Sequence, residues 1–188
     1  GNKTLDYIES LNIKTPVSII PSGIDLDIIK KASSQGIREK HNLPKNAKIL
    51  LYVGRLSKEK NIPFLLEAAK DIISKRKDIY LVLAAGGPYE KKLKQMADDL
   101  NIAGNLVFTG EIKYPDIFNY YKCGDIFVFS SKTETQGLAI AEAKACGLPV
   151  VAINSSGISE SIVDGIDGFL VNEDVQLFSE NELWQELK

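Results

Sequence analysis

The feature that most constrains this fold is a regular alternation of short apolar runs and helical segments, which begins at Lys48. The apolar runs are continuous, which is typical of strands buried on both faces. Strands that alternate with helices favour a parallel sheet with right-handed crossovers and helices on both sides. We therefore predict an α/β fold, a doubly wound parallel sheet of Rossmann-like form. The predicted strands cover residues 49–53, 79–84, 106–108, 126–129, 149–153 and 168–171.

Helical spacing of apolar residues predicts the helices between these strands. One of them begins with a proline near its start, and another ends at Gly147 and Pro149, as helices commonly do. Ser179 and Glu182 match a capping box and predict the start of a last helix. The predicted helices cover residues 63–73, 89–100, 115–121, 138–146 and 158–163.

The two ends of the chain differ from this regular pattern. Residues 1–16 precede it and are expected to be an interdomain remnant, whereas residues 17–188 are expected to form one domain, whose ligand is inferred from its loops below. Both ends look cut, because the pattern starts late and the last helix is unfinished. We therefore expect a domain that has been excised from a longer protein.

Composition excludes several classes of protein. The formal net charge is -2, with basic and acidic residues interspersed, so nucleic acid is not an expected partner. Two cysteines and one histidine predict neither a disulfide framework nor a histidine-based metal site. The sequence contains no apolar stretch near the ~20 residues of a membrane span and does not open with a signal peptide. A cytoplasmic location is expected.

The loops that follow the strands are the candidate sites, because parallel sheets bind ligands beyond the carboxyl ends of their strands. Glu134 and Glu142 frame one such loop and the helix after it. Gly137 allows close approach of a ligand to the backbone, and a helix beginning at Leu138 points its amide groups at the mouth of the sheet. Carboxylates suit sugar hydroxyls and a helix N-terminus suits phosphate, so this layout predicts a nucleotide sugar as ligand.

Two further loops carry suitable groups. Arg55 and Lys60 follow the first strand and could turn toward one anion, the arginine as a fork and the lysine as a point charge. Gly86 and Gly87 end the second strand, where they could form a tight turn, admit a ligand, or do both. Taken singly, the two glutamates and the two cations are also consistent with ordinary solvated side chains.

Other phosphate-binding and metal-binding motifs do not fit. The dinucleotide fingerprint and the phosphate loop of P-loop enzymes do not occur after the first strand, which argues against a dehydrogenase or a P-loop kinase. Asp25 and Asp27 have the spacing of a metal-binding Asp-x-Asp pair. They lie outside the regular pattern and are interpreted as the start of a helix. No metal site is predicted.

Several motifs in their order and spacing resemble the carboxyl-terminal domain of family-four retaining glycosyltransferases, which have the GT-B fold. The resemblance runs from about Pro16 to Val171. The motifs that carry it are Ile20-Pro-Ser-Gly-Ile-Asp25, Tyr52-Val-Gly-Arg-Leu56 with Lys60-Asn61, Phe108-Thr-Gly110, Glu134-x7-Glu142, Ala145-Cys-Gly-Leu-Pro-Val-Val-Ala152 and Asp167-Gly-Phe-Leu-Val171.

The resemblance implies a role for each matching residue. Arg55 and Lys60 match the pair that binds the donor pyrophosphate, and Glu134 matches the acid near the reacting sugar; these three are the predicted catalytic residues. Glu142 matches the acid that holds the ribose hydroxyls. The remaining predicted donor-binding residues, in the sugar-diphosphate loop and the nucleoside pocket, are Gly54, Gly86, Ile112, Thr135, Gln136, Gly137 and Leu138.

The implied function is transfer of a hexose from a UDP-sugar or another nucleoside diphosphate sugar to a sugar or lipid acceptor, without a cofactor. The family's amino-terminal domain, which carries the acceptor site, is mostly absent, so this chain by itself is expected to be inactive. Peripheral membrane contact would come through that domain. Residues 131–138 resemble glucosyltransferases that act on diacylglycerol. Two alternatives stay open: a nucleotide-sugar epimerase of the same fold, and a non-catalytic nucleotide-binding module.

Overall fold

The predicted sheet is present. The computed structural model describes residues 2–12, 14–20, 22–134, 136–155 and 157–187, and within them six strands form one sheet in the order β3-β2-β1-β4-β5-β6. All five neighbouring pairs are parallel, so the prediction of a doubly wound α/β fold is confirmed. The strands are β1 (Lys48–Val53), β2 (Ile79–Ala84), β3 (Leu106–Phe108), β4 (Ile126–Phe129), β5 (Val150–Ile153) and β6 (Phe169–Val171).

The core lies on both faces of the four central strands. Nearly all residues of β1, β2, β4 and β5 are buried, as their continuous apolar runs predict. The edge strands β3 and β6 are only partly buried along their whole length, because each has a neighbouring strand on one side only. Burial on both faces is therefore a property of the centre of the sheet.

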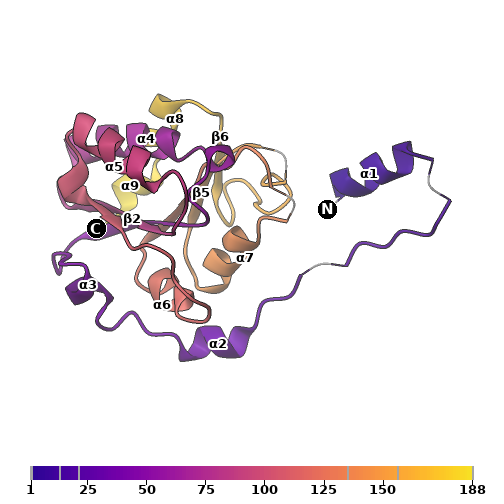
Figure 1. Ribbon diagram of the computed structural model, residues 1–188, viewed down its shortest axis with the longest axis horizontal. Coiled ribbons are helices and arrows are strands. Elements are labelled where there is room, and N and C mark those ends of the chain that lie inside the picture. Colours follow the sequence, from indigo (N-terminus) through magenta and orange to yellow (C-terminus); the bar gives the residue numbers. More distant parts are fainter. Residues whose placement is uncertain (1, 13, 21, 135, 156, 188) are drawn as a thin grey trace.

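Helices cover the two faces in the way that a doubly wound sheet requires. In Figure 1, α4 (Ile62–Lys75) and α5 (Glu90–Asp99) lie on one side of the sheet, and α6 (Ile117–Tyr121) and α7 (Leu138–Ala145) lie on the other. The short helix α8 (Val175–Ser179) packs against α4 and is followed by α9 (Leu183–Glu186). Two 3₁₀ turns, η1 (Lys58–Lys60) and η2 (Ala103–Asn105), complete the connections.

Two local predictions are wrong. Residues 158–163, predicted as a helix, form a series of turns over positions 157–161. Ser179 does not open a helix: it is the last residue of α8, and its hydroxyl donates to the carbonyl of Gln176. A serine near the end of a helix can bond back to the preceding turn, so a capping-box spacing alone does not distinguish a helix start from a helix end.

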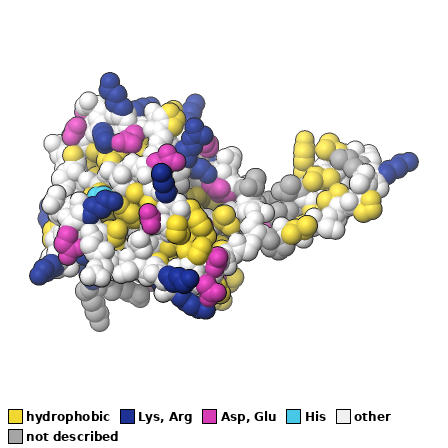
Figure 2. All heavy atoms as spheres, turned by 60° about the horizontal axis from the view of Figure 1, so that its bottom comes forward, with side chains coloured by type: hydrophobic (Ala, Val, Ile, Leu, Met, Phe, Trp, Pro, Cys, Tyr) yellow, Lys and Arg dark blue, Asp and Glu magenta, His cyan; other side chains and the backbone are white. Residues whose placement is uncertain are grey.

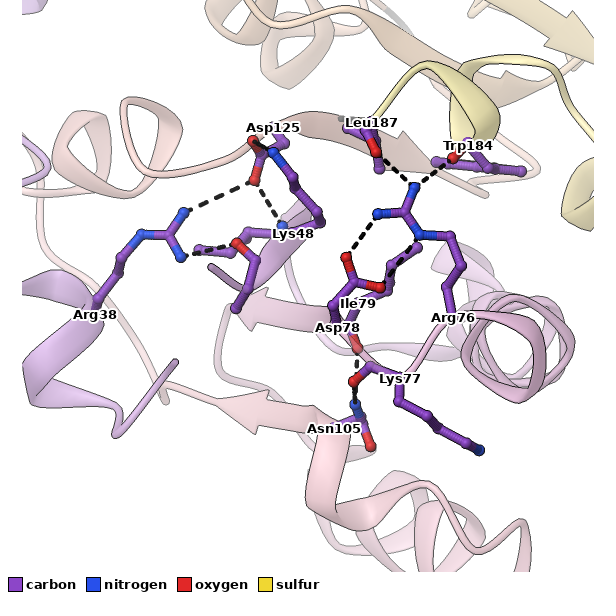
Figure 3. A network of polar contacts seen from close by, with 12 residues as sticks. Arg38, Lys48, Arg76, Lys77, Asp78, Ile79, Asn105, Asp125, Trp184 and Leu187 are labelled. Carbon is purple, nitrogen blue, oxygen red and sulfur yellow. Dashed lines mark hydrogen bonds and ion pairs between the residues drawn. The ribbon is translucent and has the colours of Figure 1, made fainter. Parts of the chain in front are cut away.

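The amino edge of the sheet is held by polar contacts (Figure 3). Asp125, just before β4, accepts a hydrogen bond from the Ile49 amide at 2.8 Å and lies 3.9 Å from both Arg38 and Lys48. Arg76 forms a two-pronged ion pair with Asp78 and donates to the carbonyls of Trp184 and Leu187 at 3.0 and 2.7 Å. Asp125 thus joins the starts of β1 and β4, and Arg76 joins the segment before β2 to the carboxyl-terminal segment.

The first residues form an arm that extends away from the sheet (Figures 1 and 2). The arm contains α1 (Asn2–Ser10) and leads to α2 (Leu26–Lys31) and α3 (Ile37–Lys40). Asp25 is the N-cap of α2 and accepts from the amides of Asp27 and Ile28, so the interpretation of this Asp-x-Asp pair as a helix start is confirmed. Tyr7, Leu11 and Ile20 of the arm are exposed.

Candidate functional site

The site lies at the carboxyl edge of the sheet, opposite the polar contacts of the amino edge. The chain runs from β1 outward through β2 to β3, then crosses to β4 and runs outward in the other direction. The strand order therefore reverses between β1 and β4, which is where ligands bind in open parallel sheets. The loops after β1 and β4 carry most of the predicted site residues.

A pocket of about 620 Å³ opens at this edge. It brings together five of the predicted site residues, from the ends of β1 and β2, the loop after β3, and helix α7. These five are Gly54, Arg55, Gly86, Ile112 and Glu142. Its remaining walls are formed by Val53, Ala84, Ala85, Gly87, Glu111, Tyr114 and Ile117.

Glycines at the wall of the pocket pack closely against neighbouring atoms. A Cβ atom at Gly87 would overlap the carbonyl oxygen of Leu56, and one at Gly54 would lie 2.8 Å from the hydroxyl of Tyr52. At Gly86 an added Cβ would lie 3.1 Å from the amide nitrogen of Glu111, on the opposite loop. These positions therefore need glycine for packing, and the same lack of side chains exposes backbone at the pocket wall.

The predicted catalytic residues Lys60 and Glu134 meet across the switch point. The Lys60 Nζ atom lies 2.5 Å from Glu134 Oε1, and the two side chains are only 20% and 15% exposed. Lys60 comes from η1 after β1, and Glu134 comes from the loop after β4. Arg55, by contrast, is exposed and lines the pocket. The two predicted phosphate-binding cations thus start from different environments: one is ion-paired and the other faces solvent.

Two buried serines hold these loops together. The Ser130 hydroxyl, directly after β4, lies 2.8 Å from the Lys60 carbonyl and 3.1 Å from that of Asn61. Ser131 contacts the Thr133 carbonyl, and Ser155 donates to the Ser131 carbonyl at 2.7 Å. Both Ser130 and Ser131 are fully buried. Sequence reasoning did not assign these serines a role, although two small polar residues directly after an apolar strand were a usable signal.

Helix α7 begins at Leu138, as predicted, with Gly137 as its N-cap in the left-handed conformation at φ 60°. An added Cβ at Gly137 would also lie 2.8 Å from the Ser161 hydroxyl, so both backbone and space favour glycine. Gln136 accepts a hydrogen bond at its side chain from Ser22 at 2.7 Å. Thr135, also predicted to bind the donor, lies outside the described residues. The helix start therefore presents amide groups at the same edge as the pocket.

Glu142 is half-buried and has a partner that the sequence analysis missed. The Tyr121 hydroxyl donates to Glu142 Oε2 at 2.8 Å. Burial raises the pKa of Glu142, and the Tyr121 hydrogen bond acts in the opposite direction by favouring the charged form. Burial also raises the pKa of Tyr121, so its proton stays available for donation. The adjacent tyrosines in the predicted helix were the available signal, but they are equally typical of core packing.

The described residues offer neither a metal-ligating cluster nor a membrane-spanning helix. No cluster of three or more histidine, cysteine, aspartate or glutamate side chains suited to a metal ion occurs among them. Likewise, none of the helices in the described ranges combines the length and the apolar character that a membrane crossing needs.

A protein-family model matches most of the chain. Residues 33–181 match the family model described as "Glycosyl transferases group 1". The matched range includes every predicted site residue, the whole sheet and the pocket.

Two curated relatives extend this match. The chain is 35% identical over 170 residues to alpha-monoglucosyldiacylglycerol synthase of Streptococcus pneumoniae, with 88% of this chain and 38% of that protein covered. It is 33% identical over 165 residues to D-inositol 3-phosphate glycosyltransferase of Mycolicibacterium smegmatis, with 85% of this chain and 37% of that protein covered. The chain thus spans less than half the length of the curated relatives it matches.

A solved structure has the same fold. HepE from Anabaena, determined in complex with UDP-glucose, superimposes with a TM-score of 0.73 at 25% identity. The superposition covers 90% of this chain and 46% of that protein. WaaG, a glycosyltransferase involved in lipopolysaccharide biosynthesis, gives a TM-score of 0.77 at 24% identity over 90% of this chain and 47% of that one. The sheet and its helices therefore match the GT-B type of domain.

Proposed function

Since the chain belongs to the group 1 glycosyl transferases, we propose that it is the nucleotide-sugar-binding, carboxyl-terminal half of a retaining glycosyltransferase. The reaction moves a hexose from a nucleoside diphosphate sugar to a sugar or lipid acceptor. The observation that carries the proposal is the pocket at the switch point, which places Arg55 and Glu142 on walls built from different halves of the sheet. The HepE complex with UDP-glucose supports a nucleotide sugar as the ligand.

Each group has a chemical task in the proposed reaction. As the glycosidic bond breaks, the leaving diphosphate gains negative charge, which Arg55, Lys60 and the N-terminus of α7 stabilise. Glu134 orients the donor sugar and eases positive charge at the anomeric carbon. Glu142 accepts hydrogen bonds from the ribose hydroxyls. The acceptor attacks on the face that the leaving group departs from, which retains the configuration.

The Lys60–Glu134 ion pair implies an order of steps during donor binding. The ammonium group of Lys60 is held by the carboxylate of Glu134. A diphosphate at the mouth of the sheet offers Lys60 a second, more highly charged partner. Transfer of Lys60 to the diphosphate leaves the Glu134 carboxylate to meet the sugar, so donor binding itself assembles the reacting centre.

The acceptor is proposed from the relatives. Alpha-monoglucosyldiacylglycerol synthase, at 35% identity, supports a membrane lipid as the acceptor. The family model describes transferases, so it does not favour the epimerase or the non-catalytic module. An assay of the full-length protein with diacylglycerol acceptors and a panel of nucleotide sugars, with analysis of the anomer formed, tests the acceptor and the retention of configuration.

Calorimetry tests the donor site directly. Residues 1–188 should bind UDP or GDP in the presence of EDTA, because the proposed site neutralises phosphate with side chains and a helix N-terminus. Arg55→Ala should weaken UDP binding roughly tenfold and uridine binding little, since charge-assisted hydrogen bonds of this kind contribute about 1.5–3 kcal/mol. Lys77→Ala, which changes an exposed lysine just before β2, is the control and should bind as the wild type does. Folded protein that binds neither diphosphate would refute the proposal.

A further inference from the structure

Tyr121 does not line the pocket, but its hydroxyl contacts Glu142, which does. The side chain is fully buried, and its ring packs against Phe118 and Phe127, with centroids 5.9 and 5.8 Å apart. The ring therefore has little freedom to rotate away. Its hydroxyl lies 2.8 Å from Glu142 Oε2 and 3.3 Å from the carbonyl of Ala139, one turn earlier in α7. A single hydroxyl proton serves the shorter contact to the carboxylate.

The hydrogen bond from Tyr121 restricts the orientation of the Glu142 carboxylate. Glu142 projects from α7 into the pocket, while Tyr121 comes from α6, so the hydrogen bond joins two helices on the same face of the sheet. With Oε2 held by a buried donor, the carboxylate has fewer orientations available to it at the pocket wall. A pair of neighbouring hydroxyls, as on a ribose, needs a carboxylate that is both charged and fixed in this way.

We propose that Tyr121 is a positioning residue for ribose recognition: it holds Glu142 so that the carboxylate accepts both ribose hydroxyls. This inference rests on the proposed function, since it assumes that the pocket takes a nucleoside diphosphate. It adds a residue outside the loops at the strand ends, on a helix that follows β3. Tyr121 does not touch the ligand and acts through Glu142.

The surroundings of the pair define what else can affect it. Tyr52 of β1 and Cys146, the C-cap of α7, also interact with Tyr121, and Cys146 interacts with Glu142 as well. Arg55 and Glu111 line the same pocket from the loops after β1 and β3. Burial raises the pKa of Glu142 while the Tyr121 hydrogen bond lowers it, so removal of the hydroxyl should raise the pKa further.

The test compares UDP with 2′-deoxy-UDP by calorimetry on residues 1–188. Wild-type protein should bind UDP roughly tenfold more tightly, because the missing hydroxyl is a donor to a charged group. Tyr121→Phe keeps the ring and removes only the hydroxyl, and it should reduce this preference to about twofold or less. Should GDP be the diphosphate that binds, GDP and 2′-deoxy-GDP serve in the same way.

The pH dependence gives a second readout. The preference for UDP requires the charged carboxylate, so in the wild type it should disappear as the pH falls through the pKa of Glu142. In Tyr121→Phe the residual preference should disappear at a higher pH. A tyrosine that only packs in the core would change the melting temperature and leave both the preference and its pH midpoint unchanged.

Tyr120→Phe is the matched control. Tyr120 is the adjacent residue, is equally buried, and its hydroxyl lies 3.0 Å from His41 Nε2 and 3.3 Å from Lys40 Nζ, away from the pocket. This variant should keep the full preference. Tyr121→Met, which also removes the hydroxyl and has a flexible apolar side chain that can fill the space, should lose most of the preference, and this second variant decides the matter if Tyr121→Phe does not fold.

Each outcome is informative. Wild-type protein that binds UDP equally well with and without the 2′-hydroxyl overturns the role of Tyr121 but leaves the proposed function standing. A folded Tyr121→Phe or Tyr121→Met variant with an undiminished preference has the same consequence. Folded wild-type protein that binds neither UDP nor GDP overturns the proposed function itself, and the inference with it.

Discussion

The Lys60–Glu134 ion pair predicts opposite effects of two substitutions in neighbouring groups. The two side chains are in contact, with 2.5 Å between Nζ and Oε1. A diphosphate must take Lys60 from Glu134. Lys60→Ala should therefore weaken UDP binding, whereas Glu134→Gln should leave it unchanged or strengthen it. UDP carries no sugar, so the proposed contact of Glu134 with the donor sugar does not affect this comparison.

The magnitudes follow from the burial of the pair. Exposed ion pairs contribute about 0–1 kcal/mol, whereas loss of one partner of a buried pair costs about 3–5 kcal/mol. At 20% and 15% exposure this pair lies between the two limits. We expect Lys60→Ala to cost about 1–2 kcal/mol of unfolding free energy, or about 2–8 °C in melting temperature for a domain of this size.

The effects on binding can be worked in the same way. Loss of the lysine should weaken UDP binding roughly tenfold, the value expected for one charge-assisted contact. Glu134→Gln keeps the shape of the side chain but removes its charge, so the competition for Lys60 falls by about 1 kcal/mol and UDP should bind up to about fivefold more tightly.

Titration calorimetry with UDP and thermal unfolding of the same samples measure both quantities. Lys58→Ala, in the same 3₁₀ turn but exposed, is the matched control and should change neither. If Glu134→Gln weakens UDP binding as much as Lys60→Ala does, the pair acts as one phosphate-binding unit and the competition between carboxylate and diphosphate is refuted. If Lys60→Ala has the same melting temperature as the Lys58→Ala control, the ion pair does not stabilise the protein.

Three further predictions concern activity and stability. In a full-length protein that carries this domain, Glu142→Gln should mainly raise the donor KM, whereas Glu134→Gln should lower kcat and kcat/KM together; identical defects in steady-state kinetics would contradict these separate roles. Residues 1–188 alone should bind the donor without sustained transfer to a lipid or sugar acceptor, because they span 38% of the pneumococcal relative; product analysis that found steady transfer would disprove this. Arg76→Ala should lower the free energy of unfolding by about 2–3 kcal/mol, because Asp78 and two carbonyl groups lose their partner. The same variant should bind UDP with unchanged affinity in calorimetry. Lys77→Ala is the control and should change neither quantity.

The sheet could be predicted from the sequence because strands that are buried on both faces consist of continuous apolar residues. A run such as Ile126–Phe129 must be apolar throughout when both faces are covered, and its length separates it from a helix. The helix after Gly137 was equally readable, since its N-cap needs a left-handed residue. The loops that contain glycine were predicted as candidate ligand-binding loops because parallel sheets bind ligands beyond the carboxyl ends of their strands.

Contacts between distant segments were harder to predict. The Lys60–Glu134 pair depends on β1 and β4 being neighbours, and strand order is set by the crossover after β3 rather than by any pattern within the strands. The Tyr121–Glu142 bond has the same origin, because it joins α6 to α7. The capping box at Ser179 failed for the opposite reason: its spacing is local, but the helix that precedes it was not recognised.

The polar contacts at the amino edge of the sheet have a practical consequence for redesign of the pocket. Arg76, Asp78 and Asp125 lie at the opposite end of the strands from the pocket. Substitutions in the loops after β2 and β3 leave these contacts in place. A library that varies Glu111, Ile112 and Tyr114 should therefore retain a large fraction of folded members, even where nucleotide selectivity changes. Additional stabilising substitutions, introduced first around Arg76, would widen the range of loop sequences that such a library tolerates.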